Sequence, residues 1–262
     1  MEKLIENFMI EELRNNFKTF IKKELSGYDY VYLTSDLRGF LKKYYPVKAE
    51  ELCNLLTSCL LKENITILIP AYSYVRKGIF YVDKTNSNLS YFTKWSLKLK
   101  KAYRTSHPIF SVCVLGKKWK IFKDMGKSAF GKNSIWDKLL KNKSSLLHFG
   151  SPFSLGNTMQ HYVEQNVGAN YRFHKTFKTK VFNKKKYIGK NFSAFVQNKK
   201  YNGELIETNT KKISKLIMKQ RFYKVIGNDE DLTNITHLDF KKTYEFMCKQ
   251  FYKNNNIFIS YK

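Results

Sequence analysis

Segments with helical and with strand-like patterns alternate along the first half of the chain, and this alternation limits the chain to a small set of folds. Apolar residues recur at helical spacing over residues 2–24 and 49–62. Short apolar runs of strand length separate such segments, at 28–34, 65–69 and 145–149. Strands that alternate with helices predict a sheet covered by helices on both faces, which is a three-layer α/β/α sandwich.

The second half of the chain has a more antiparallel pattern. Between residues 171 and 200, aromatic and apolar residues alternate with lysines, which is typical of antiparallel strands. The predicted fold class is therefore α/β, a three-layer sandwich with a mixed central sheet and a partly antiparallel C-terminal half. The whole chain, 1–262, is interpreted as a single domain that begins with a helix over 1–27 and carries 171–200 as a β-rich excursion. Further strands are expected at 109–115, 119–122, 222–226 and 257–260, further helices at 134–141, 157–168, 203–218 and 239–251, and an excursion or a pair of short strands at 78–95.

Basic residues exceed acidic ones by a wide margin, with 48 Lys and Arg against 21 Asp and Glu and a net charge of +27. Such a charge points first to a nucleic-acid partner. Only six of the basic residues are arginine, however, and direct reading of bases favours arginine forks. The lysines occur with abundant Asn, Ile, Tyr and Phe, a mixture that the codon bias of an AT-rich genome produces. The composition therefore disfavours nucleic-acid binding, while the charge still suits an anionic partner.

The four cysteines, Cys53, Cys59, Cys113 and Cys248, are scattered along the sequence. None is close enough to a second cysteine or a histidine to indicate a zinc site, so no metal is expected and the thiols are interpreted as reduced. No apolar run approaches the ~20 residues of a membrane span. The N-terminal segment is acidic and amphipathic, unlike a signal peptide, and a cytoplasmic location is expected.

A histidine and a glutamate follow the strand at 145–149, in the stretch LLHFGSPFSLGNTMQHYVE (146–164). His161 and Glu164 are three residues apart and therefore share one face of the helix expected at 157–168. A carboxylate in that position orients an imidazole and stabilises its charged form, as a general base requires. The helix starts just after a strand, where enzymes of open α/β folds bind their ligands. Spacing alone also fits a solvent-exposed pair on an ordinary helix, which is the commoner case.

Four short blocks of the sequence have recognisable patterns. One is Thr-x-x-His-x-x-Glu at a helix start, formed by Thr158, His161 and Glu164. The others are Arg-x-x-His-Pro-x-x-Ser over 104–111, a strand into proline and a Ser-Tyr turn over 65–74, and a strand that ends in Ser-Asp-Leu over 33–38. Together, and in this spacing and order, they resemble the aminoglycoside 3-N-acetyltransferase family, the antibiotic N-acetyltransferases. The resemblance extends from about residue 28 to the C-terminus.

The resemblance implies an N-acyltransferase that uses acetyl-CoA, or another acyl-CoA, and no metal. It implies His161 as the general base, Glu164 as the residue that orients it, and Thr158 as a hydroxyl donor toward the acyl oxygen or the nucleophile. The acceptor would attack the thioester directly, without a covalent enzyme intermediate. The residues implied at the acyl-CoA groove are Ser35, Asp36, Leu37, Arg38, Tyr72 and Ser73. The residues implied at the substrate are Arg104, His107 and Ser111.

Simpler roles stay open for three of these residues. Ser35 is equally compatible with a helix cap, Arg38 with a surface ion pair, and His107 with a structural role in a turn.

The acceptor is where the chain departs from the family. Aminoglycosides are polycations and require a carboxylate-rich pocket, but residues 75–103 contain a single acid, Asp83. A basic enzyme is better matched to an anion, so the sequence predicts a nucleotide-linked amino sugar of a bacterial surface glycan as the acceptor. Aminoglycoside acetylation that confers resistance is the alternative, and a polyanion- or nucleic-acid-binding protein without catalysis is a second one. An acyl carrier protein stays open as the acyl donor, and a monomer or homodimer is expected.

Overall fold

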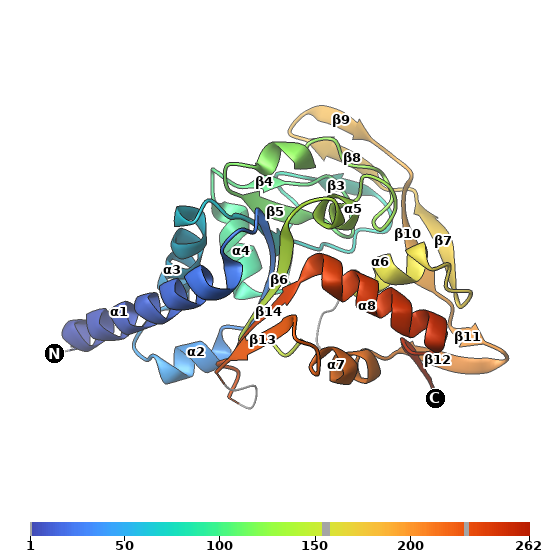
Figure 1. Ribbon diagram of the computed structural model, residues 1–262. Helices are drawn as coiled ribbons and strands as arrows, with labels where there is room; N and C mark the ends of the chain where they lie inside the picture. Colours follow the sequence, from blue (N-terminus) through green and yellow to red (C-terminus); the bar gives the residue numbers. More distant parts are fainter. Residues whose placement is uncertain (1, 154–157, 228–230) are drawn as a thin grey trace.

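A seven-stranded mixed sheet forms the centre of the protein (Figure 1). The computed structural model describes residues 2–153, 158–227 and 231–262. The three strands in the middle of the sheet run parallel, and those on either side pair antiparallel, so the predicted mixed sheet is confirmed. In order across the sheet, the strands are β13 (Tyr223–Ile226), β14 (Ile235–Asp239), β6 (Ser144–Phe149), β1 (Tyr30–Ser35), β2 (Thr66–Pro70), β5 (Val112–Leu115) and β4 (Tyr103–Arg104).

Helices cover both faces of this sheet, and each face has its own apolar core (Figure 1). Side chains of β1 alternate between the two cores, with Tyr30 and Tyr32 in one and Val31 and Leu33 in the other. The predicted three-layer α/β/α arrangement is therefore confirmed. The first core is covered by α5 (Ile135–Leu140), α6 (Met159–Asn166), α7 (Lys211–Ile217) and α8 (Phe240–Lys253), and the second by α1 (Glu2–Phe20), α2 (Arg38–Lys43), α3 (Ala49–Lys62) and α4 (Tyr91–Lys98).

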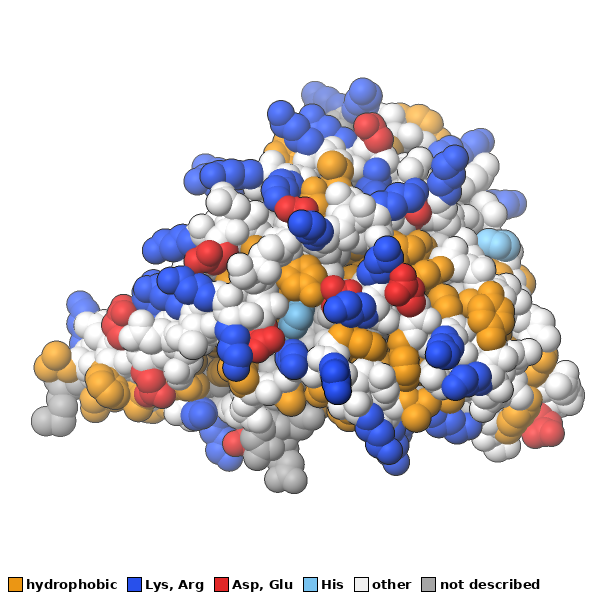
Figure 2. Space-filling view, in the orientation of Figure 1, with side chains coloured by type: hydrophobic (Ala, Val, Ile, Leu, Met, Phe, Trp, Pro, Cys, Tyr) orange, Lys and Arg blue, Asp and Glu red, His pale blue; other side chains and the backbone are white. Residues whose placement is uncertain are grey.

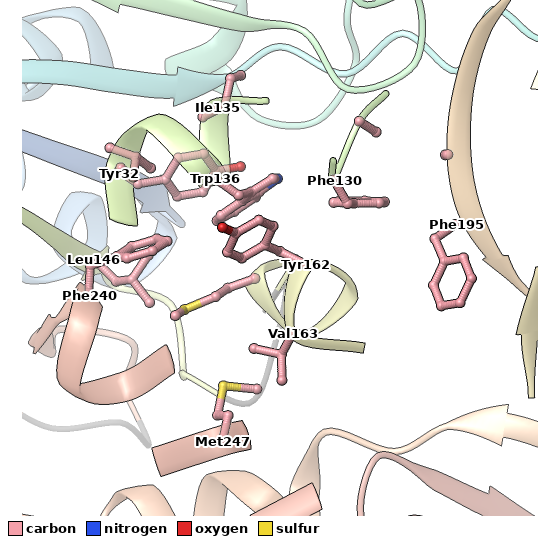
Figure 3. Close-up of a cluster of buried hydrophobic side chains, with 14 of the residues drawn as sticks. Tyr32, Phe130, Ile135, Trp136, Leu146, Tyr162, Val163, Phe195, Phe240 and Met247 are labelled. Carbon is pink, nitrogen blue, oxygen red and sulfur yellow. The ribbon is translucent and has the colours of Figure 1, made fainter. Parts of the chain in front are cut away.

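Aromatic packing fixes the position of α6, the helix that carries His161. The ring centroid of Trp136 lies 4.7 Å from that of Tyr32 in β1 and 6.2 Å from that of Phe240 in α8. Figure 3 shows Trp136 of α5 and Tyr162 of α6 pointing toward one another within this core. Because Tyr162 is almost completely buried, α6 has a fixed rotation about its own axis.

The β-rich excursion forms small sheets beside the main one. Strand β7 pairs antiparallel with β10 and β8 with β9, as the alternating pattern predicted, and β11 pairs antiparallel with β12, which was not predicted. The strands are β3 (Ile79–Tyr81), β7 (Arg172–Phe177), β8 (Lys180–Asn183), β9 (Lys186–Gly189), β10 (Phe192–Gln197), β11 (Lys200–Tyr201), β12 (Glu204–Thr208) and β15 (Ile259–Tyr261). Strand β7 starts immediately after the turn that follows α6, so the excursion brings side chains to the site described below.

Three predicted elements are wrong in type or extent. The helix expected at 203–218 begins only at Lys211, because Asn202 and Gly203 both have positive φ (51° and 83°) and close a hairpin into β12. Residues Trp119–Phe122 form a 3-10 helix instead of a strand. The stretch 78–95 contains one short strand, β3, and the start of α4, and strand β14 was not predicted.

The described residues contain no group of three or more side chains that could hold a metal ion. All four cysteines are free thiols, and three of them are buried. Burial raises the pKa of the Cys53 thiol to about 12, so this thiol stays protonated. In the part of the chain that the structure describes, no helix is both long enough and apolar enough to cross a membrane.

Candidate active site

A cleft lies at the carboxyl ends of the parallel strands β1, β2 and β6. Its deeper part, of about 270 Å³, is lined by side chains that include Tyr32, Thr34, Tyr72 and Thr158. An adjoining part of about 370 Å³ shares Ser35 with it. The chain leaves β1 toward β2 on one side and returns to pair with β1 through β6 on the other. This reversal of strand order is the place where open α/β sheets bind ligands.

A glycine lets the two walls of the cleft approach each other. Gly150 follows β6 with a φ of +63°, and a Cβ atom there would lie 2.0 Å from the carbonyl oxygen of Asp36. No larger residue fits without moving the turn after β1. Next to it, Thr34 Oγ1 lies 2.7 Å from Nδ1 of His148, which places the buried His148 beneath the cleft.

His161 and Glu164 are held together on α6 by a network of buried hydrogen bonds. Nδ1 of His161 lies 3.0 Å from Oε2 of Glu164, as the spacing of the two residues predicted. The Glu164 carboxylate is fully buried, accepts a hydrogen bond of 3.1 Å from the Tyr171 hydroxyl, and lies 2.8 Å from Nε of Arg172. The Arg172 guanidinium also donates to the backbone carbonyl of Phe195. A charge this deeply buried requires its partner, so Glu164 and Arg172 form one unit.

Two contacts compete for Nδ1 of His161, because Nη2 of Arg172 also lies 2.8 Å from it. We assign the proton to Nδ1. The Glu164 carboxylate can only accept and the Arg172 guanidinium can only donate, so a protonated Nδ1 donates to Oε2 of Glu164, and its contact with Nη2 of Arg172 is then a close approach and not a hydrogen bond. This tautomer leaves the Nε2 lone pair of His161 available to take a proton.

The imidazole of His161 is neutral at physiological pH. Burial lowers its pKa most, the charge of Arg172 lowers it further, and Glu164 raises it in part, so the net pKa lies below the usual 6.5. The side chain is nevertheless 26% exposed, which leaves it accessible from the protein surface. A neutral and accessible imidazole is the state that a general base needs.

A group of hydroxyls lies at the entrance to α6. The Tyr32 and Tyr72 hydroxyl oxygens are 2.5 Å apart, and both tyrosines hydrogen-bond with Thr158. Burial raises the pKa of Tyr72 to about 12, so its hydroxyl stays protonated and can donate. Thr158 is the N-cap residue of α6 and lines the cleft.

A row of aromatic rings connects this hydroxyl group with His161. The ring of Tyr72 lies 5.2 Å from that of Phe110, Phe110 lies 5.0 Å from Phe130, and Phe130 lies 5.5 Å from the imidazole of His161. Tyr74, which also lines the cleft, contacts the same row through Tyr72. The row therefore links the cleft, through Tyr72, with His161, which is not among the side chains that line either part of the cleft.

The residues expected at the acyl-CoA groove lie together, but with different exposures. Ser35, Asp36 and Arg38 line the outer part of the cleft. Arg38 forms an ion pair of 2.5 Å with Asp36 and is 80% exposed, so the surface ion pair left open by the sequence is present. The side chain of Leu37 is buried in the core. The Ser73 hydroxyl donates to the carbonyl of Pro108, which holds the turn in place.

The three residues expected at the substrate lie beneath the cleft instead, which corrects that prediction. Arg104 and Ser111 are buried, and both donate to the carbonyl oxygen of Ala71. Nδ1 of His107 accepts the backbone N–H groups of the following turn, and its Nε2–H donates to the carbonyl of Ser193. Burial lowers the pKa of His107 to about 4, so it is a neutral, structural histidine. Arg104 and Ser111 therefore hold the turn that carries Tyr72, and His107 holds the turn that follows it in the sequence.

The sequence reading missed Tyr171, Arg172 and Phe130. The first two follow α6 by a turn and contact Glu164 only because the chain folds back into β7. One signal was present in the sequence: Arg172 is one of only six arginines in a lysine-rich chain. The cluster just before α6, Gly156 and Asn157, lies outside the described residues.

Together, the three-layer fold and the cleft at the carboxyl ends of its parallel strands define an α/β protein with a ligand-binding site where enzymes of this class have theirs. The profile of a known family, aminoglycoside 3-N-acetyltransferase, matches residues 46–230 of this chain. The chain belongs to that family, as its sequence motifs predicted, and it is an N-acetyltransferase. A search of curated protein sequences found no match.

Several solved structures share the fold at low sequence identity. The apoenzyme of aminoglycoside acetyltransferase AAC(3)-IVa has a TM-score of 0.68 at 14% identity, covering 94% of this chain and 90% of that chain. The YokD protein from Bacillus subtilis has a TM-score of 0.69 at 16% identity, covering 92% and 99%. AAC-IIIb in a binary complex with CoASH has a TM-score of 0.71 at 12% identity, covering 92% and 96%.

Proposed function

We propose that this protein transfers an acetyl group from acetyl-CoA to an amino group of an aminoglycoside, with His161 as the general base. The observation that carries the proposal is the neutral imidazole of His161, which the buried Glu164 holds through Nδ1 and which a row of aromatic rings connects with the cleft at Tyr72. Family membership and the aminoglycoside acetyltransferases of the same fold support the choice of acceptor.

Each group of the site has a role in direct transfer. Acetyl-CoA supplies an activated thioester. The acceptor amine attacks the carbonyl carbon, an N–C bond forms and the C–S bond breaks, and Nε2 of His161 takes the amine proton and returns it to the departing sulfur. The hydroxyls of Thr158 and Tyr72 donate toward the negative charge that develops on the carbonyl oxygen. Glu164 stabilises the imidazolium that forms while the proton is held.

The cleft itself suits the donor. Its wall is aromatic where it passes Tyr72 and Tyr74, and hydroxyls of Ser35 and Ser90 offer hydrogen bonds to a pantetheine arm. Arg38 at the outer part is exposed, and it can turn from Asp36 to a phosphate, because an exposed ion pair contributes little stability.

A second candidate acceptor is an anionic amino sugar linked to a nucleotide, and one observation favours it. Among the described residues that line the cleft, the only carboxylate is Asp36, which is paired with Arg38. Glu164 is fully buried and paired with Arg172. A polycation would find few unpaired carboxylates in the cleft, whereas an anionic acceptor would be attracted by the net positive charge of the protein. The same positive charge would attract an acidic acyl carrier protein as the acyl donor.

Thiol release from acetyl-CoA, measured with a panel of aminoglycosides and nucleotide-linked amino sugars, tests the proposal. We expect release above the hydrolytic background with at least one aminoglycoside and a new amide in the product by mass spectrometry. If thiol were released only with nucleotide-linked amino sugars, the acceptor would be such a sugar and not an aminoglycoside. No release with any acceptor, in a folded preparation that binds CoA, would contradict both.

The low pKa of His161 predicts how the enzyme responds to acid. A base works only while it is unprotonated, so activity should persist at pH 6.5 and fall as the pH drops through a pKa below that value. An NMR titration of the His161 ring, assigned by comparison with His161→Ala, measures this pKa without interference from the acceptor amine. In Glu164→Gln the pKa should be lower still, because Glu164 raises it. A midpoint above 6.5 in the wild type would contradict the proposed electrostatics.

A further inference from the structure

A second, strongly basic pocket lies on the other side of the segment that borders the cleft. It has a volume of about 660 Å³ and lies between α4, β4 and the turn after β8. Five lysines line it against a single carboxylate, Asp83, whose Oδ1 accepts the backbone N–H of Lys184. Figure 2 shows Lys and Arg side chains gathered at the end of the molecule that β8 and β9 form. The lining lysines are Lys84, Lys94, Lys98, Lys100 and Lys184.

A buried cation forms part of the same lining. Arg104 is only 7% exposed and stacks its guanidinium 4.9 Å from the ring of Phe80. Its N–H groups donate to Ser111 and to the backbone carbonyls of Ala71, Val82 and Thr85. These are neutral acceptors, and no carboxylate of the described residues lies within 4.0 Å of the guanidinium. A buried charge without a counter-charge is costly, and a bound anion would supply that counter-charge.

This pocket is separate from the catalytic cleft, although the two share a wall. Along the segment that leads from β3 into α4, Ser90 and Thr93 line the cleft, whereas Asn88 and Lys94 line the basic pocket. Neutral hydrogen-bonding side chains also line the basic pocket, among them Asn86 and Asn88. Lysine point charges, an arginine and neutral amides in a concave site of this size match a phosphorylated small molecule better than an extended polyanion.

We propose that the basic pocket between α4 and β4 binds the phosphate groups of a small molecule. The lysines supply positive charge at the pocket surface and the amides supply directed hydrogen bonds. The buried guanidinium of Arg104 adds positive electrostatic potential from beneath the pocket. The phosphates can belong to the acyl donor or to a separate phosphorylated ligand. The inference does not depend on which amine the enzyme acetylates.

Inorganic pyrophosphate is the probe that tests the site. Isothermal titration would compare the wild type with Lys94→Gln/Lys98→Gln/Lys184→Gln and with a control of equal charge, Lys241→Gln/Lys249→Gln/Lys253→Gln, on the exposed side of α8. We expect the pocket variant to bind pyrophosphate at least 10-fold more weakly than the control variant, and the wild-type affinity to fall with added salt. Equal affinities of the two variants, or no binding to the wild type, would overturn the proposal. Arg104 is left intact in this test because it holds three backbone carbonyls.

Titration with CoA and with pantetheine then identifies the source of the phosphates. If they are those of the donor, CoA displaces pyrophosphate and binds the pocket variant more weakly than the control, while pantetheine, which lacks the nucleotide, binds both alike. If CoA binds both variants equally while pyrophosphate still distinguishes them, the ligand is a separate phosphorylated molecule. Both results support a phosphate site, and neither requires a successful acetylation assay.

Discussion

Replacing His161 by alanine should reduce kcat/KM for acetyl transfer by about 10²–10⁴-fold, the range that a positioned general base contributes. Among the histidines in the described part of the site, His161 is the one that is accessible, and its lowered pKa keeps it neutral at pH 7. The fold should survive the change, because the ring contacts only the edge of the core at Phe130. Glu164 keeps Tyr171 and Arg172 as partners after the ring is removed.

A second histidine provides the matched control for that measurement. His174 is exposed on β7, and its ring contacts Phe195. His174→Ala removes the same atoms and should leave thiol release within a factor of two of the wild type, as expected for a surface change of about 0.5 kcal/mol or less. Thermal melting of both variants separates loss of chemistry from loss of structure. If His161→Ala kept a tenth or more of the wild-type rate while folded, another residue would be the base.

The layers of the fold were predictable because the core positions are periodic in sequence. Helix α3 has the predicted bounds, and the central strands differ from their predicted bounds by one or two residues. Helix α3 buries the face that its apolar spacing indicates, and the central strands are buried on both faces. The prediction failed at 203–218, where apolar residues at helical spacing also fit a hairpin strand followed by a short helix. There the Asn202–Gly203 turn determined the outcome.

Local spacing predicted only half of the network of contacts around Glu164. His161 and Glu164 are neighbours on one helix turn, so their contact follows from helix geometry alone. Arg172 meets the same carboxylate through the return of the chain into β7, a tertiary contact that no local pattern encodes. The same limit explains Arg104 and His107, since their sequence block resembled a substrate site but their burial was not visible in the sequence.

Net charge, which led the sequence analysis to predict an anionic acceptor, is a weak guide to what the cleft binds. Most of the lysines are spread over the surface, while the two carboxylates nearest the site are each paired with an arginine. Net charge therefore describes the surroundings of the cleft better than its interior. The acceptor is determined by the few groups that line the cleft, and family membership is stronger support for an aminoglycoside than net charge is against it.

Replacing Glu164 by alanine should have the largest effect on stability, lowering the free energy of unfolding by about 3–5 kcal/mol. The carboxylate is fully buried and receives the Tyr171 hydroxyl, His161 and Arg172, so its removal leaves a buried guanidinium without a counter-charge. Burial of Arg172, whose side chain is 3% exposed, makes that charge expensive to retain. Urea denaturation followed by circular dichroism measures the change.

Two further variants show whether the buried charge is the cause. Glu164→Gln keeps the shape and a hydrogen-bond acceptor but loses the charge, so its loss of stability should fall between that of the wild type and that of Glu164→Ala. Arg172→Met removes the guanidinium that Glu164→Ala leaves without a counter-charge. The double variant Glu164→Ala/Arg172→Met should therefore lose less unfolding free energy than the sum of the losses of the two single variants. Additive losses would mean that Glu164 and Arg172 do not act as a pair.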